Sequence, residues 1–117
     1  MHNFKELKVW QKGRKFVKDI YILTRKFPKE ELFVLTSQMR RAAISISSNI
    51  AEGSGRGSDN DFARFIDIAT GSAFELESQL YVACDLEYFS EDELDIYLDK
   101  IQEVQKMLFH FKKHLKS

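Results

Sequence analysis

The stretch Arg40-Arg-Ala-Ala-Ile-Ser-Ile-Ser-Ser-Asn-Ile-Ala-Glu-Gly53 decides the fold of this 117-residue chain. It has the apolar period of a helix but few bulky side chains, so a neighbouring helix can pack closely against it. Gly71-Ser-Ala73 is similarly narrow. Placed opposite one another, the two stretches would bring two helices into close contact, and we expect them to form the centre of a helical core.

Around this centre the apolar spacing predicts four helices, at residues 5–26, 28–52, 58–86 and 91–115. Pro28 separates the first two helices, and Gly53 is expected to adopt the left-handed conformation that ends the second. Ser58 with Asp61, and Ser90 with Glu93, have the spacing of N-terminal caps. Short connections between four helices give an all-α fold, an antiparallel up-down-up-down four-helix bundle with residues 1–117 as one domain.

The second helix should turn one seam of residues, spaced three and four apart, toward the core. The seam residues are Leu32, Leu35, Met39, Ala42, Ile46 and Asn49. Asn49 interrupts the apolar run, and a buried Asn at such a position lowers stability while it fixes register or oligomeric state. Ser45 and Ser48 are expected to bond back to carbonyl groups one turn earlier.

The composition favours a chain that folds in a reducing compartment. A single cysteine, Cys84, excludes an intramolecular disulfide, and we expect it to be a small core residue. No apolar run reaches the roughly 18 residues of a membrane span. The N-terminal residues lack the apolar core of a signal peptide, so we expect a cytoplasmic location.

The charges are balanced overall but segregated along the chain. Residues 1–41 hold 11 basic and four acidic side chains, a net of +7, whereas residues 42–100 hold three and 13, a net of −10. Residues 101–117 hold four and one, a net of +3. This asymmetry favours either binding of a polyanion by the basic part or contact between the basic part of one subunit and the acidic part of another.

Two sets of cations are candidates for contacting RNA or DNA phosphates. The first set recurs at helical steps on the first helix and comprises Lys8, Lys12, Lys15 and Lys18. The second set comprises Arg40, Arg41, Arg56 and Arg64. Such binding would be largely independent of sequence and steeply sensitive to salt. Arg40 and Arg41 have an equally good structural interpretation, as partners of Glu52 or Glu75.

The alternative hypothesis is a protein that assembles or scaffolds without touching nucleic acid. The basic first helix of one subunit would face the acidic third and fourth helices of its neighbour. Apolar residues outside the core seams would fill that interface, and the candidates are Phe33, Phe65 and Tyr81. The two hypotheses are compatible, because a ring can gain avidity from several weak basic patches.

No catalytic residues, cofactor or metal site are predicted. His110 and His114 are one helical turn apart, but two lysines lie between them and the zinc-protease pattern is absent. A carboxylate-bridged bundle needs Glu-x-x-His on two helices, which this chain lacks. The glycines from Gly53 to Gly57 lack the strand and Lys-Ser/Thr pair of a phosphate-binding loop, so we expect a helix connector.

Several segments of the chain resemble one known family. These are Phe4-Lys-Glu-Leu-Lys-Val-Trp10-Gln11, Phe27-Pro28, Ser37-Gln-Met-Arg40-Arg41-Ala-Ala, Ser45-Ile-Ser-Ser-Asn49-Ile-Ala-Glu52-Gly53 and Ala69-Thr-Gly71-Ser72-Ala73-Phe-Glu75. Together they resemble the bacterial four-helix-bundle proteins encoded in intervening sequences of large-subunit ribosomal RNA genes. A related branch is the accessory protein of diversity-generating retroelements, which works with a reverse transcriptase on RNA.

The resemblance implies a homopentameric ring of four-helix bundles in the cytoplasm, without enzyme activity or cofactor. It implies RNA, a ribosomal component or a reverse transcriptase as the class of partner. Within this family pattern Asn49, Glu52, Gly53 and Gly71 would form the structural centre of the bundle. A non-enzymatic oligomer that binds nucleic acid or a nucleoprotein partner is therefore the leading expectation.

Overall fold

The computed structural model describes residues 2–116 and contains four long α-helices. They are α1 (Lys8–Thr24), α2 (Leu35–Ser54), α3 (Asp59–Asp85) and α4 (Glu91–Lys116). Two short 3₁₀ turns, η1 (Phe4–Glu6) and η2 (Lys29–Glu31), precede α1 and α2. No strand occurs within residues 2–116. The prediction of an all-α four-helix bundle is confirmed.

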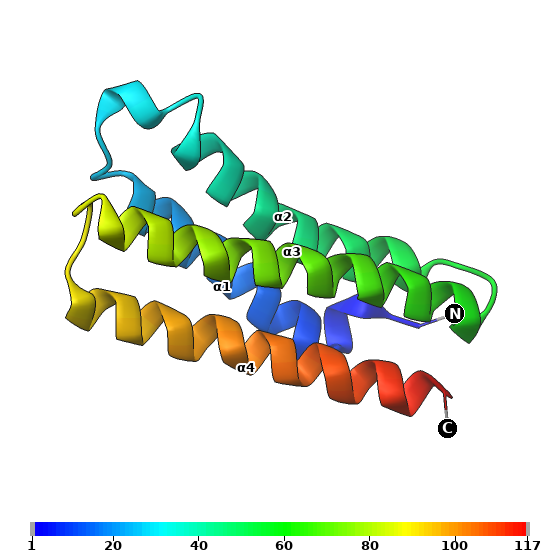
Figure 1. Cartoon of the computed structure of the whole chain (residues 1–117). Helices are drawn as coiled ribbons and strands as arrows, with labels where there is room; N and C mark the ends of the chain where they lie inside the picture. The colour runs from blue at the N-terminus through cyan, green and yellow to red at the C-terminus, as the bar shows by residue number, and fades with distance from the viewer. Residues whose placement is uncertain (1, 117) are drawn as a thin grey trace.

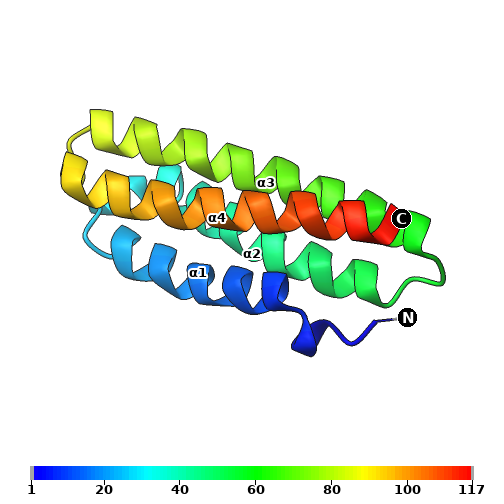
Figure 2. The same cartoon turned by 90° about the horizontal axis from the view of Figure 1, so that it is seen from below.

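Consecutive helices run antiparallel and side by side (Figures 1 and 2). α2 and α3 pack together most extensively, followed by α3 and α4, α1 and α2, and α1 and α4. Helices α1 and α3 therefore lie diagonally across the bundle, and so do α2 and α4. As a result, the outward faces of α1 and α3 point in opposite directions.

The core contains the apolar seams of all four helices. Small alanines on α2 and α3 alternate with larger fully buried side chains such as Ile46, Ile50 and Leu76. The buried alanines of this pair are Ala42, Ala43, Ala63, Ala69, Ala73 and Ala83. They allow the close approach of α2 and α3 that the sequence predicted, since a short side chain leaves room for a neighbouring helix.

The predicted seam of the second helix is wrong at both ends. Leu32 lies before α2 and is 46% exposed. Ile50 is fully buried, whereas Asn49 is half-buried on the flank. The Asn49 amide donates to the Ser45 carbonyl and to Ser45 Oγ, at 2.8 and 3.0 Å. Ser45 Oγ in turn shares a hydrogen bond with Ser72 Oγ of α3 at 2.8 Å. The expected backbone bond of Ser45 is thus wrong, and these polar groups join α2 to α3 instead.

The two glycines assigned to the structural centre also need correction. Gly53 does not end α2 in the left-handed region, because no described glycine has positive φ and the helix continues to Ser54. It is buried against α3, and a Cβ on it would lie 2.7 Å from Phe62 Cδ1. Gly71 faces open space rather than α2, since an added Cβ meets nothing within 4 Å.

The boundaries of α3 and α4 agree closely with the prediction, and those of α1 and α2 do not. Both N-terminal caps form, since Ser58 Oγ accepts from the Asp61 N–H and Ser90 Oγ from the Glu93 N–H, each at 3.1 Å. The second helix was expected from Pro28, but α2 begins at Leu35. Val34 has φ −120° and ψ −101°, outside the helical region, and this separates η2 from α2.

Candidate nucleic-acid interface

The outward face of α1 carries a row of cations. Arg14, Lys15, Lys18 and Arg25 are all exposed and recur at helical spacing. Lys5 of η1 lies beside them, because its carbonyl accepts a hydrogen bond from the Gln11 amide at 2.9 Å. We call these five residues the α1 basic surface. Within residues 2–116, no carboxylate lies within 4.0 Å of their charged nitrogens.

The α1 basic surface contains a shallow depression with an aromatic wall. Its lining consists of Lys5, Trp10, Gln11, Arg14, Lys15 and Lys18. Trp10 is half-buried, with the edge of Phe4 packed at a centroid distance of 4.9 Å and the Arg14 guanidinium 5.5 Å from its ring. The arrangement combines positive charge with an aromatic side chain, the two features that proteins use to hold nucleic-acid strands.

The four predicted lysines of α1 occupy three different environments. Lys15 and Lys18 belong to the α1 basic surface. Lys12 is turned toward α4, where it forms an ion pair with Glu103 at 3.2 Å. Lys8 lines a separate depression together with His110 of α4. Only two of the four predicted lysines therefore belong to the α1 basic surface. Its other members, Lys5, Arg14 and Arg25, were not predicted.

The second predicted set does not join this surface. Arg40 is half-buried between α1 and α2, where its Nε donates to Thr24 Oγ1 at 2.9 Å and its guanidinium lies 4.4 Å from the Tyr21 ring. It is therefore held in the fold, although not by the predicted Glu52 or Glu75. Arg41 is exposed on the α2–α3 side and shares a shallow depression with Glu75.

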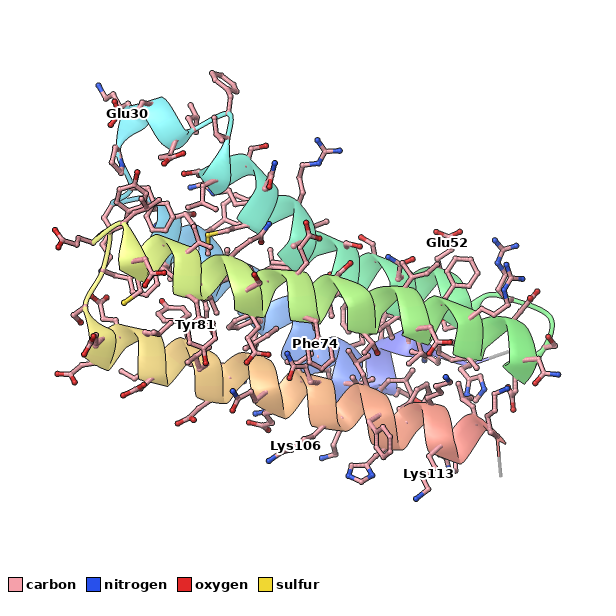
Figure 3. The ribbon with its side chains drawn as sticks, in the orientation of Figure 1. Glu30, Glu52, Phe74, Tyr81, Lys106 and Lys113 are labelled. Atoms are coloured by element: carbon pink, nitrogen blue, oxygen red, sulfur yellow. The ribbon has the colours of Figure 1, made fainter. Side chains whose placement is uncertain are left out.

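The other two arginines lie near the α2–α3 turn. Arg56 forms an ion pair with Glu52 at 3.4 Å and stacks 4.7 Å from the Phe65 ring. Arg64 forms an ion pair with Asp61 at 3.1 Å. Glu52 is exposed on the outer side of α2 (Figure 3), so it does not require a buried partner.

The predicted interface residues also occupy different environments. Phe33 is 88% exposed on the connection that precedes α2. Tyr81 is 46% exposed and lies on α3 one heptad after Phe74, which is 56% exposed (Figure 3). Phe65 is half-buried beneath Arg56 and close to Gly53, so it is committed to the α2–α3 packing.

The described residues contain no group of three or more His, Cys, Asp or Glu side chains placed to hold a metal ion. Desolvation, together with the Glu91, Asp85 and Asp95 carboxylates, raises the pKa of the half-buried Cys84 thiol, which disfavours the nucleophilic thiolate. None of the described helices has both the length and the apolar character needed to cross a membrane.

Lys5, Trp10, Arg14 and Arg25 were not among the residues predicted to contact nucleic acid. A usable signal was present, because Arg14, Lys18 and Arg25 follow steps of four and seven. If arginines had been counted together with lysines, the spacing would have predicted the face that carries Arg14, Lys18 and Arg25. The contribution of Lys5 could not be read in this way, since η1 is not continuous with α1.

Comparison with known proteins agrees with the fold. The family model for the 23S rRNA-intervening sequence protein matches residues 5–110. The chain is similar to the crystal structure of a protein of unknown function from the S23 ribosomal protein family of Bacteroides thetaiotaomicron VPI-5482. The TM-score is 0.83 and the sequence identity 28%, over 90% of this chain and 95% of that one. The search of curated proteins gave no match.

Proposed function

This chain belongs to the 23S rRNA-intervening sequence protein family, and from that premise we propose that it is a non-enzymatic, cytoplasmic RNA-binding protein. RNA is held by the α1 basic surface, where phosphates meet Lys5, Arg14, Lys15, Lys18 and Arg25. The observation that carries the proposal is that these cations share one exposed face without carboxylate partners among residues 2–116. Cations that are already paired gain less from a phosphate.

Binding of this kind reads the charge of the strand rather than its sequence. Each Lys or Arg that meets a phosphate releases condensed counterions, so affinity falls steeply as salt is added. Trp10 adds an aromatic contact at the side of the depression. Charge alone does not separate RNA from DNA, and the family description favours RNA, alone or within a nucleoprotein such as a ribosomal particle.

Charge reversal on α1 tests the proposal. The double variant Arg14→Glu/Lys18→Glu should bind a fluorescein-labelled RNA at least about tenfold more weakly at low salt, as measured by fluorescence anisotropy. The control is Lys29→Glu/Arg41→Glu, which changes the net charge equally but lies off the α1 surface. Equal losses in both variants would contradict the assignment to α1, and an unchanged affinity of the α1 variant would reject the proposal.

A second candidate function, self-assembly, is favoured by the outward face of α3. Apolar side chains line this face on both sides of the exposed Gly71. They are Ile68, Phe74, Tyr81, Val82 and Leu86, each between 45% and 56% exposed. An apolar stripe of this kind on a small protein is typical of an interaction site. We propose that this face contacts a different surface of the next copy, because a ring of five, as the family resemblance implies, is built from head-to-tail contacts.

A further inference from the structure

The C-terminal half of α4 presents an exposed aromatic ring among cations. Lys106, Phe109, His110 and Lys113 follow steps of three, four and seven, so they share one face of the helix. Phe109 is 63% exposed. The Lys113 ammonium lies 6.0 Å from the centre of its ring, and the His110 ring lies edge-on at 5.6 Å. Figure 3 shows Lys106 and Lys113 extending from α4 away from the other helices.

The carboxylates next to this face are engaged by other side chains. Asp67 forms an ion pair with Lys112 at 2.7 Å. Glu77 accepts hydrogen bonds from the Gln105 and Gln102 amides at 2.7 and 3.2 Å. Lys106 and Lys113 have no carboxylate within 4.0 Å in the part of the chain that the structure describes.

The positive charge of Lys106 and Lys113 distinguishes the surroundings of Phe109 from those of the exposed rings on α3. The apolar side chains on the outward face of α3 lie among the exposed carboxylates Glu75 and Asp85, which would repel a phosphate backbone. The cations around Phe109 would attract one. A ring with cations beside it and solvent above it suits a base whose phosphates are held close by.

A depression between the helices joins this face to α1. Lys8 of α1 and His110 of α4 both line it, and its floor is apolar, with Val9, Met107 and Phe111. A strand on the α1 basic surface can extend over Lys8 and His110 to reach Phe109. The lining of the depression contains no carboxylate and offers apolar surface to the bases.

We propose that the α4 face formed by Lys106, Phe109, His110 and Lys113 stacks an unpaired base of a single-stranded RNA that also lies on α1. The inference rests on the proposed function of the α1 basic surface and adds the class of ligand. Bases of a duplex are already stacked on one another and cannot reach Phe109, whereas those of a single strand can. The α1 cations alone would not distinguish the two.

The test is the variant Phe109→Ala, assayed with two labelled RNA probes of about twelve nucleotides, an unstructured single strand and a duplex. Loss of one stacked base should weaken single-strand binding about five- to a hundredfold and leave duplex binding unchanged. Phe109→Trp should bind the single strand like the wild type. The control Phe33→Ala removes an even more exposed ring far from these cations and should leave the affinity for both probes unchanged.

The outcomes separate this inference from the function on which it rests. If Phe109→Ala binds the single strand as tightly as Phe33→Ala does, the inference is wrong, although binding by α1 can still hold. Equal weakening for single strand and duplex would also overturn it, because the ring would then support backbone binding rather than stacking. A wild-type protein that binds neither probe would instead reject the proposed function itself.

Discussion

At the scale of single residues, Gly53 shows how the family-like stretch holds α2 against α3. Its lack of a side chain lets the Phe62 ring and the Phe65 Cβ approach, each 2.7 Å from where a Cβ would lie. Gly71 lies in the middle of α3 without any such neighbour. The two glycines thus have opposite structural roles, although sequence alone gave them the same one.

The pair gives a matched prediction. Gly53→Ala should lower the free energy of unfolding by about 1–3 kcal/mol, because the new methyl group overlaps two aromatic side chains. Gly71→Ala should raise it by up to about 1 kcal/mol, since alanine favours the helix and meets no obstacle. Urea unfolding at equilibrium measures both. A tolerated Gly53→Ala would show that α2 and α3 do not approach as closely as described.

Sequence reasoning identified Gly53 as important but not its conformation. A glycine followed by Ser-Gly-Arg-Gly reads as a helix end, because that is where flexible residues gather. The close approach of Phe62 depends on the relative position of two helices, which a pattern along one helix does not contain. Ser45 was misplaced for the same reason, since its partner Ser72 lies on α3.

At the scale of the elements, Tyr88 joins the two connections at one end of the bundle. Its hydroxyl donates to Glu31 Oε2 at 2.6 Å, and its ring packs against Phe27. The bond links the turn between α3 and α4 to η2. The hydrogen bond to Glu31, with desolvation and the nearby carboxylates of Glu31 and Glu30, raises the pKa of Tyr88 to about 12.

This raised pKa predicts an alkaline loss of stability. A group whose pKa is higher in the folded state stabilises the fold fully below its ordinary value of 10.0, and that stabilisation is lost as the pH rises through about 12. Tyr88→Phe should lower the urea midpoint near neutral pH. The difference from wild type should shrink as the pH rises from 10.0 to about 12. A difference that does not change with pH would refute the link to Glu31.

The helix boundaries that the sequence predicted well are those with local caps. Ser58 and Ser90 act on their own helices, so a short pattern contains all the information. At the start of α2 the Leu35 N–H instead donates to Glu31 Oε1 at 3.4 Å, and Glu31 is held by Tyr88 of the α3–α4 turn. The exposed connection that carries Phe33 was therefore expected to be helical and is not.

At the scale of the whole molecule, the basic surface and the apolar stripe lie on opposite sides. α1 and α3 are diagonal in the bundle, so RNA can occupy α1 while α3 contacts another copy (Figure 2). Segregation of charge along the sequence predicted the basic side but not the apolar stripe. That the two surfaces lie on opposite sides follows only from the order of the helices around the core.

Association through α3 predicts the effect of one charged substitution. Phe74→Asp should reduce the mass measured by light scattering toward that of the 13.7 kDa monomer, because it places a charge in the apolar stripe. Ile96→Asp on α4 is the matched control, since Ile96 is 55% exposed and Phe74 56%. Equal dissociation of both variants, or a wild-type protein that is already monomeric, would exclude this interface.

The central claim, that α1 holds RNA through phosphate contacts, is tested most directly by the salt dependence of binding. The affinity of the wild-type protein for a single-stranded RNA is measured over a range of salt concentrations, with the fluorescence of Trp10, the only tryptophan, as reporter. Contacts to four or five phosphates predict that log K falls against log salt with a slope of about −3. Arg14→Glu/Lys18→Glu should flatten that slope, whereas a wild-type slope near zero would contradict the account.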